Sequence, residues 1–354
     1  MTITDINSKV LTDLTSNVSP GLEGILTCQE RRLPLEAALK RCFTKAKPIS
    51  QAIAQMALKA GVDGVTLLTT GTSSSIPWGA LPGNSSGTPL GELLEIAVTP
   101  FSTWRSEVPV TSISSASFIA VPNSNAGPLS GVEREVSIAA ATVSRLSPTP
   151  TAKILKGAEK ADLLNAFEAG GVVHAASHSG HNTVNPFDSR ILLAGSDISA
   201  EEILGLDASG LELAVLSSCE SGKASPFTLP DDIVSLQSTL IYAGCRRVIG
   251  SLWPVADTAT LLFMARFYRE LINTGTFSTS SIRRALSSTA KWLREARNSE
   301  LKEFARTQNM LPHEAVGLFS SRGSSDERLY ASPEYWAAFS LMIRDLPGGI
   351  AVSK

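Results

Sequence analysis

From about residue 63 onward, short apolar runs alternate with longer stretches in which apolar residues recur at helical spacing. The apolar runs at 171–176 and 213–217 predict buried strands, and the stretch at 257–273 predicts an amphipathic helix. Strands that are apolar on both faces are typical of parallel sheets covered by helices. The pattern therefore predicts an α/β domain with a mainly parallel central sheet.

The same reading places every element along the chain. Strands are expected at 64–69, 93–98, 117–121, 153–156, 171–176, 191–193, 213–217, 247–252 and 336–343, and helices at 131–144, 159–169, 199–204, 231–243, 257–273 and 278–296. Residues 1–60 are expected to form a helical N-terminal region, with helices at 35–46 and 50–59 separated by a break at Pro48. Residues 61–354 are expected to form one domain.

Composition and charge narrow the classes of function. The 354-residue chain is 43% hydrophobic, with a net charge of −2, so no basic surface for nucleic acid is expected. No apolar run approaches the roughly 20 residues of a membrane span, and the N-terminus has no signal pattern. We therefore expect a cytoplasmic protein. Its four cysteines form no CxxC pair, so free thiols are expected.

Two of the predicted strands end in small polar residues that carry reactive side chains. The block at 171–180 carries His178, and the block at 213–222 carries Cys219. The carboxyl ends of parallel strands meet at one edge of a sheet. A thiol and an imidazole there are the minimum parts of a cysteine nucleophile and its base. Backbone amides of Ser179 or Gly180, and of Cys219, are candidates for binding the oxyanion.

Three other chemistries are disfavoured by the same residues. Residues 217–224 resemble a phosphate-binding loop, but Ser217 replaces its first glycine and Ala224 its final hydroxyl residue. His174, His178 and His181 beside Asp188 suggest zinc, yet no fourth-ligand pattern is evident. A GxSxG motif is missing, which disfavours a serine hydrolase. No metal or cofactor is needed for the thiol chemistry.

Several motifs in order resemble those of the CHAT family of clan CD cysteine peptidases, relatives of caspases and separase. They are the histidine block at 174–180, the cysteine block at 216–222, the run at 243–257, the closing segment at 333–339, and the upstream segments at 76–81 and 131–135. The resemblance covers about residues 60–345. It implies a caspase-like three-layer sandwich, in which helices flank a mainly parallel sheet.

The resemblance also assigns roles to single residues. It makes His178 the general base and Cys219 the nucleophile, with the amides of Ser179 and Cys219 as the oxyanion hole. The family usually has glycine where this chain has Ser179. A serine there would be strained if the backbone needed a positive φ.

For the substrate, the resemblance implies a peptide bound as an added strand along Ser251–Trp253, with Trp253 as an apolar wall. Asp257 resembles the acid that lines the P1 pocket in separase, and Asp231 and Asp232 are alternatives. A carboxylate there favours arginine or lysine at P1. Asp257 equally suits the N-cap of the helix that follows it.

We therefore expect a cysteine endopeptidase that cleaves a protein substrate. The family leads us to expect activation by a separate sensor protein, and a role in bacterial defence or regulated cell death, such as cleavage of a gasdermin-like effector. Loops around Cys219 and at 320–331 are expected to become ordered on activation. The alternative is a catalytically silent module that binds a partner at its sheet edge.

Overall fold

The central feature of the computed structural model is an eight-stranded sheet. The structure describes residues 35–101, 113–146, 148–182, 184–218, 221–222, 234–313, 315, 318 and 324–345. In spatial order the strands are β1 (Gly64–Leu68), β2 (Glu95–Thr99), β13 (Phe339–Ile343), β12 (Arg247–Ser251), β11 (Leu211–Ser217), β7 (Gly171–Ala176), β3 (Ser115–Ala120) and β6 (Thr151–Lys156). Only the β12–β13 pair is antiparallel among these pairings. The predicted mainly parallel sheet is confirmed.

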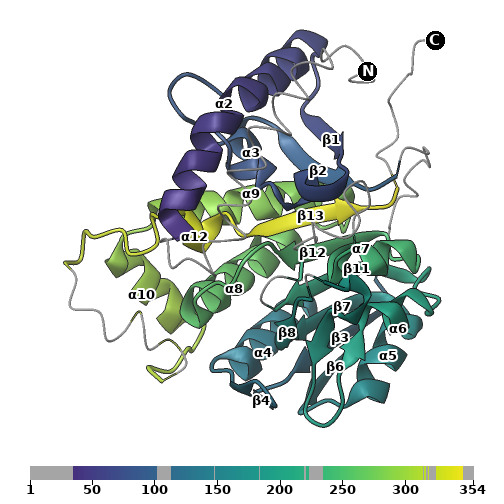
Figure 1. Cartoon of the computed structure of the whole chain (residues 1–354). Helices are drawn as coiled ribbons and strands as arrows, with labels where there is room; N and C mark the ends of the chain where they lie inside the picture. The colour runs from purple at the N-terminus through teal and green to yellow at the C-terminus, as the bar shows by residue number, and fades with distance from the viewer. Residues whose placement is uncertain are drawn as a thin grey trace.

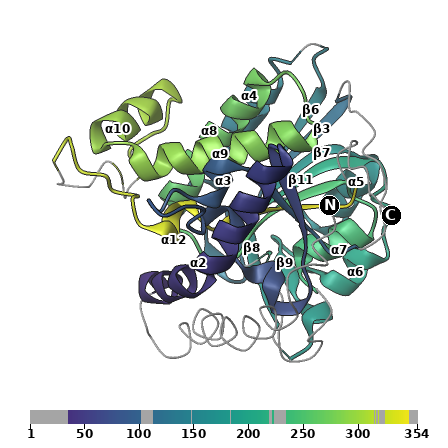
Figure 2. The same cartoon turned by 90° about the horizontal axis from the view of Figure 1, so that it is seen from above.

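Helices cover both faces of this sheet (Figure 1). One face carries α4 (Val132–Val143), α8 (Asp257–Asn273) and α9 (Thr279–Glu295), and the other carries α5 (Lys160–Ala169), α6 (Ala200–Leu204) and α7 (Leu236–Tyr242). Figure 2 shows α4, α8 and α9 together on one side of the strands, with α6 and α7 on the other. The three-layer α/β architecture expected from the sequence is therefore confirmed.

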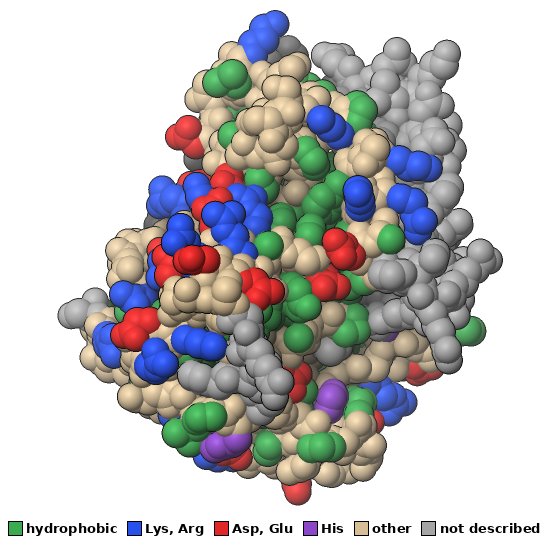
Figure 3. Space-filling view, turned by 90° about the vertical axis from the view of Figure 1, so that its left-hand side faces the viewer, with side chains coloured by type: hydrophobic (Ala, Val, Ile, Leu, Met, Phe, Trp, Pro, Cys, Tyr) green, Lys and Arg blue, Asp and Glu red, His purple; other side chains and the backbone are tan. Residues whose placement is uncertain are grey.

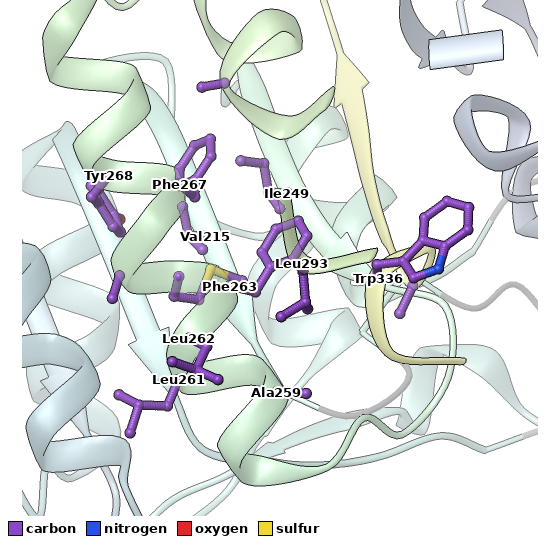
Figure 4. Close-up of a cluster of buried hydrophobic side chains, with 14 of the residues drawn as sticks. Val215, Ile249, Ala259, Leu261, Leu262, Phe263, Phe267, Tyr268, Leu293 and Trp336 are labelled. Atoms are coloured by element: carbon purple, nitrogen blue, oxygen red, sulfur yellow. The ribbon is translucent and has the colours of Figure 1, made fainter. Parts of the chain in front are cut away.

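The larger core lies between α8 and the middle of the sheet. Phe263 and Phe267 of α8 pack against Val215 of β11 and Ile249 of β12, and all four are at most 1% exposed (Figure 4). Burying a side chain of this size contributes about 1.5–3 kcal/mol. This packing fixes the strands whose ends carry the candidate site.

Helix α2 (Leu35–Ala60) contradicts the predicted break, because it runs through Pro48 without interruption. A proline inside a helix costs about 3 kcal/mol, since it removes one backbone hydrogen bond. Apolar residues on both sides of it are buried, including Leu39 before Pro48 and Ile53 after it. Ser50, two residues after the proline, donates a hydrogen bond to the carbonyl of Pro82 at 2.6 Å. Tertiary packing therefore outweighs the local helix breaker.

The buried residues of α2 join the two cores of the domain, so this helix has no core of its own. The remaining short helices are α3 (Leu90–Leu93), α10 (Asn298–Thr307), α12 (Pro333–Trp336) and the 3₁₀ turns at Gly71–Ser75, Trp78–Ala80 and Pro186–Asp188. The last predicted strand begins later than expected because Pro333 opens α12, and Trp336 lies in that helix.

A second, smaller sheet was not expected in full. Its strands are β8 (His178–Gly180), β9 (Arg190–Leu192) and β10 (Ile198–Ser199), while β4 (Asn123–Ser124) and β5 (Gly127–Pro128) form a separate hairpin. The chain continues after β7 as β8 and pairs with β9, with His178 opposite Leu192. Three residues are too few to show a strand period.

In Figure 1, β13 points away from the left-hand side of the molecule, and β12 is antiparallel to β13. The carboxyl ends of β12 and of its parallel neighbours β11 and β7 therefore lie at the left-hand surface. Figure 3 shows hydrophobic side chains in a central band there, with basic and acidic side chains intermixed beside them.

Among the described residues, no helix combines the length and the apolarity that crossing a bilayer would require.

Candidate active site

The two strands that carry the candidate residues are direct neighbours. β7 and β11 are parallel, and Ala176 at the end of β7 is paired with Ser217 at the end of β11. The next residues, Ser177 and Ser218, therefore leave the sheet side by side. The prediction that both blocks end at one edge of neighbouring strands is confirmed.

His178 is the first residue of β8 and is half-buried. Its Nε2 atom is buried and has no hydrogen-bond partner within the described residues. The next residue, Ser179, is opposite Ile191 of β9. Among the described residues, Asn309 alone combines a positive φ with a side chain. Ser179 therefore carries none of the backbone strain that replacing glycine there could have caused.

The turn after β11 is fixed on both sides of residues 219–220. Ser221 is fully buried, and its hydroxyl donates to the carbonyls of Leu216 and Ser218, each at 3.2 Å. The same hydroxyl accepts a hydrogen bond of 3.0 Å from the backbone N–H of Ser251. Cys219, Asp231 and Asp232, three of the predicted site residues, lie outside the described residues.

Gly222 closes this turn against β12. Its N–H donates to the carbonyl of Ser251 at 2.9 Å. A Cβ atom at this position would come within 2.8 Å of Oε1 of Gln237. Gln237 cannot move away easily, because it is 1% exposed and its Nε2 donates to the carbonyls of Val248 and Ser340. A glycine is therefore required here.

Unpaired polar atoms gather at these two strand ends. The hydroxyls of Ser177, Ser217 and Ser218 are buried without a hydrogen-bond partner in the described part of the chain, as is Nε2 of His178. Nearly all buried polar groups in proteins are paired, since an unpaired one costs about 1–3 kcal/mol. The three hydroxyls line one cavity, so this end of β7 and β11 holds buried polar groups that the described part of the chain does not pair.

A small cavity opens next to these hydroxyls. Its volume is about 30 Å³, which leaves room for about two water molecules. The described residues around it come from five separate segments and are Leu129, Ser130, Val132, Glu135, Ser177, Ser217, Ser218, Ser251, Val255, Asp257, Thr260 and Phe339. Two of them, Glu135 and Asp257, are acidic, and none is basic. The cavity thus lies beside the residues that precede His178 and Cys219 in the chain.

Asp257 is positioned as part of this cavity. Helix α8 begins at Asp257 and its N-cap is Ala256, and within the described part of the chain no side chain caps it. The carboxylate of Asp257 instead accepts a hydrogen bond from the hydroxyl of Ser130 at 2.9 Å. As the first residue of the helix, it also lies where the helix dipole favours a negative charge.

The Ser251–Trp253 segment differs from what the sequence analysis expects. β12 is flanked by β11 and β13, and the N–H of Leu252 donates to Ala338. Both backbone groups of Ser251 are also engaged. Trp253 is 2% exposed, and its ring N–H donates to the carbonyl of Glu334. In this structure, Trp253 is therefore buried, and the backbone N–H groups of Ser251 and Leu252 are already paired, although Ser251 does line the cavity.

His174, which could have been a zinc ligand, belongs to a buried network. The histidine is fully buried, its Nδ1 lies 3.0 Å from the hydroxyl of Tyr268, and its Nε2 lies 2.9 Å from Oε1 of Glu135. Burial and the charge of Glu135 raise the pKa of Tyr268 well above 10.0, so the phenol keeps its proton. Both ring nitrogens of His174 therefore already have protein partners.

Glu135 and Tyr268 are functional candidates that the sequence reasoning missed. A signal was present, because Glu135 lies at helical spacing with Val132, Val136 and Ala139, which form the buried face of α4. An acidic residue on an apolar helix face points to a buried partner. Among the residues that the structure describes, no group of three His, Cys, Asp or Glu side chains is close enough to hold a metal ion.

Comparison with known proteins identifies the family. Residues 35–345 match the CHAT domain. No curated protein matches the chain.

The Saccharomyces cerevisiae separase–securin complex is similar in structure, with a TM-score of 0.47 and 14% identity over 79% of this chain and 16% of that one. The chain thus spans about a sixth of the matched chain. Porphyromonas gingivalis RgpB, a gingipain R described as an Arg-specific cysteine proteinase, has a TM-score of 0.48 and 10% identity over 83% of this chain and 68% of that one.

Proposed function

The chain belongs to the CHAT domain family, and from this premise we propose that it is a cysteine endopeptidase with Cys219 as nucleophile and His178 as general base. Family membership and the α/β fold support a peptidase of clan CD. The single observation that carries the proposal is the site at the ends of β7 and β11. There His178 keeps a buried ring nitrogen without a partner, beside three buried hydroxyls that also have none within the described residues.

The proposed reaction has two stages. His178 takes the proton of the Cys219 thiol while the sulfur attacks the carbonyl carbon of the scissile peptide. His178 then passes that proton to the departing amine, which leaves a thioester on Cys219. Water then attacks the thioester while His178 accepts a proton from it, which releases the acid and restores the thiol. The backbone N–H groups of Ser179 and Cys219 bind the negative oxygen in each stage.

The small acidic cavity is the proposed pocket for the substrate's P1 side chain. Asp257 lines it from the start of α8, and Asp231 and Asp232 remain alternatives from the loop after the nucleophile. A partly buried carboxylate favours a cationic side chain over a neutral one, because a charge-assisted hydrogen bond is about twice as strong as a neutral one. The proposed P1 residue is therefore arginine or lysine.

The biological setting is proposed from the family alone. An activating or sensor protein switches on the peptidase in the cytoplasm, and the substrate is a protein such as a gasdermin-like effector in bacterial defence or cell death. Loops near Cys219 and at 320–331 are the segments proposed to respond to that protein.

The test is cleavage of a fluorogenic peptide library by the purified protein, with Cys219→Ala and a matched Cys28→Ala variant. The proposal predicts that only Cys219→Ala abolishes cleavage, and that a chelator has no effect. Cleavage that persists in Cys219→Ala would end the proposal. Selective alkylation of Cys219 by a peptidyl electrophile, measured on the same protein, separates a peptidase from a silent module that binds without cutting.

A further inference from the structure

We propose that a second cavity, between α9 and β13, is the docking site at which the activating protein inserts one apolar side chain from an acidic segment. This inference rests on the proposed function and deepens it, because it gives the chemistry and the place of the partner. The cavity has a volume of about 80 Å³, compared with about 30 Å³ for the cavity beside β7 and β11. Four aromatic residues are part of its lining, namely Trp78, Phe263, Trp336 and Phe339.

The cavity reaches the surface along α9 and has the size of one side chain. Leu286, Ser287 and Ala290 line it and are partly exposed, and the side chain of Lys291, which also lines it, is 52% exposed. A volume of about 80 Å³ leaves room for roughly six water-sized groups. Since this is comparable to the side chain of leucine or phenylalanine, the cavity suits a single anchor residue of a partner.

Four polar side chains of the lining already donate to other groups of the protein. The indole N–H groups of Trp78 and Trp336 each donate to a backbone carbonyl, at 2.9 and 3.0 Å. The hydroxyl of Ser287 also donates to a backbone carbonyl, and that of Ser340 donates to the side chain of Gln237. These four groups offer no free donor, so a polar occupant would lose its bonds to water without replacement. The lining therefore favours an apolar occupant.

The charged groups next to the cavity present cations to the solvent. Lys291 pairs with Glu92 at 3.4 Å, and Arg284 pairs with Glu95 at 3.6 Å. The two basic side chains are 52% and 60% exposed, whereas the two carboxylates are only 13% and 17% exposed. Figure 3 shows basic side chains beside the hydrophobic band of this edge of the molecule. A partner that approaches α9 meets the basic groups first, so charge complementarity favours an acidic segment.

The end of α9 has the same excess of basic groups. Arg294 pairs with both Glu92 and Glu295 at 2.7 Å, and its guanidinium lies over the ring of Trp336 at 5.4 Å. This cation–π contact helps to hold the indole in the wall of the cavity. In all, α9 carries four basic residues and one acidic residue, Glu295.

Phe339 connects the docking cavity to the candidate active site, because it lines both cavities. The next residue of β13, Ser340, accepts a hydrogen bond of 3.0 Å from Nε2 of Gln237. The backbone N–H of Gln237 in turn donates to the carbonyl of Ser221, two residues after Cys219. A partner that binds one arrangement of this strand more tightly than another therefore shifts the active site toward that arrangement.

The test uses a synthetic acidic peptide, acetyl-Glu-Glu-Glu-Phe-Glu-Glu-amide, and versions with alanine for phenylalanine or lysine for glutamate. Each is titrated into the Cys219→Ala protein and followed by tryptophan fluorescence, since Trp78 and Trp336 line the cavity. The alanine version should bind at least about 10-fold more weakly, as expected for loss of an anchor residue. The lysine version should also bind more weakly, and added salt should weaken the binding of the acidic peptide.

Two variants of the protein have matched controls. Ala290→Leu fills the cavity and should weaken binding of the phenylalanine peptide at least about 10-fold, whereas Ser288→Leu, on the exposed face of the same helix, should not. Lys291→Ala should weaken binding about 2- to 5-fold, as for an exposed ion pair. Lys153→Ala, on the exposed edge strand β6, should leave binding unchanged.

Cleavage by the protein with Cys219 intact tests the connection through Phe339. The phenylalanine peptide should raise kcat/KM for a fluorogenic substrate about 5-fold or more. Ala290→Leu should remove this increase and leave the activity without the peptide unchanged. Binding without any change in cleavage would contradict the activating role of the cavity.

Four further results would overturn the docking site. The first is binding of the phenylalanine peptide that is weaker than about 1 mM. The second is equal binding of the phenylalanine and alanine peptides, and the third is unchanged binding to a folded Ala290→Leu protein. The fourth is a dimer in sedimentation that Ala290→Leu dissociates, which would place a second copy in the cavity. Peptide binding by a protein that cleaves no substrate would instead contradict the proposed function and leave the docking site intact.

Discussion

Two histidine regions on one run of chain show how surroundings assign roles. His174, in the middle of β7, is fully buried and uses both ring nitrogens to contact Tyr268 and Glu135. His178, four residues later, opens β8 and has a buried Nε2 without a partner within the described residues. The first region is complete without a ligand, whereas the second is incomplete. Identical side chains are therefore held by two protein partners in one place and, within the described residues, keep an unpaired nitrogen in the other.

The largest effect should come from His178→Ala. Removing the proposed base should lower kcat/KM between about 100-fold and about 10,000-fold, because proton transfer would lose its positioned group. Stability should change little, since Nε2 of His178 has no hydrogen bond to any residue that the structure describes. Peptide cleavage and thermal melting of the same preparation would check both expectations.

His181→Ala is the matched control for that variant. It removes a partly exposed imidazole only three residues away and should leave cleavage within a few-fold of wild type. Normal cleavage by the His178→Ala protein would contradict the difference described between the two regions. Loss of cleavage in His181→Ala to the same extent as in His178→Ala would contradict it as well.

Cysteine alkylation should distinguish an accessible, reactive thiol from the buried thiols of Cys42 and Cys245. Burial raises the pKa of Cys42 and of Cys245 from 9.0 to about 12, so both remain protonated at neutral pH. Only the thiolate reacts, so an ordinary accessible thiol near pKa 8.5 should react about 1,000-fold faster than either at pH 7.5. Iodoacetamide labelling followed by peptide mass spectrometry should find Cys219 modified first.

The shifted thiols also predict a pH dependence of stability. The folded protein keeps these protons up to about pH 12, while the unfolded chain loses them from about pH 9. The unfolded state then binds fewer protons, so stability should fall as the pH rises between these values. Early labelling of Cys42 or Cys245 in the native protein would contradict their burial.

The last effect in this series is on stability, because His174→Ala should lower the free energy of unfolding. This variant leaves the phenol of Tyr268 and the carboxylate of Glu135 buried without their partner, which should cost about 2–5 kcal/mol. Chemical denaturation would measure the loss, with His178→Ala as the comparison. Equal destabilisation by the two variants would show that the two regions do not differ as described.

Prediction from sequence succeeded where the signal was local. The strand at Gly171–Ala176 and the helix at Asp257–Asn273 were predicted with the bounds that the structure shows. Both have a clear period of apolar residues, which reports burial directly. It failed at Pro48, where the apolar face of α2 packs on both sides of the proline and outweighs the local preference. It also failed at β8, whose three residues are held as a strand by β9.

The candidate site divides in the same way. The histidine and cysteine blocks were found from their motifs, and their place at the carboxyl ends of strands at one edge of the sheet was expected from the parallel pattern. Glu135 was not found, because its role depends on a contact with His174, 39 residues away. The buried state of Trp253 depends in turn on its contact with Glu334, 81 residues away.

By itself, the sequence determined the α/β class, most of the strands and helices, and the family to which the chain belongs, because periodicity and motifs are properties of short segments. Only the tertiary structure decided that α2 continues through Pro48, that the backbone at Ser251 is already paired, and that Glu135, His174 and Tyr268 form one network. The physical reason is that a hydrogen bond or a packed contact depends on which distant elements meet, and no short stretch of sequence records that meeting.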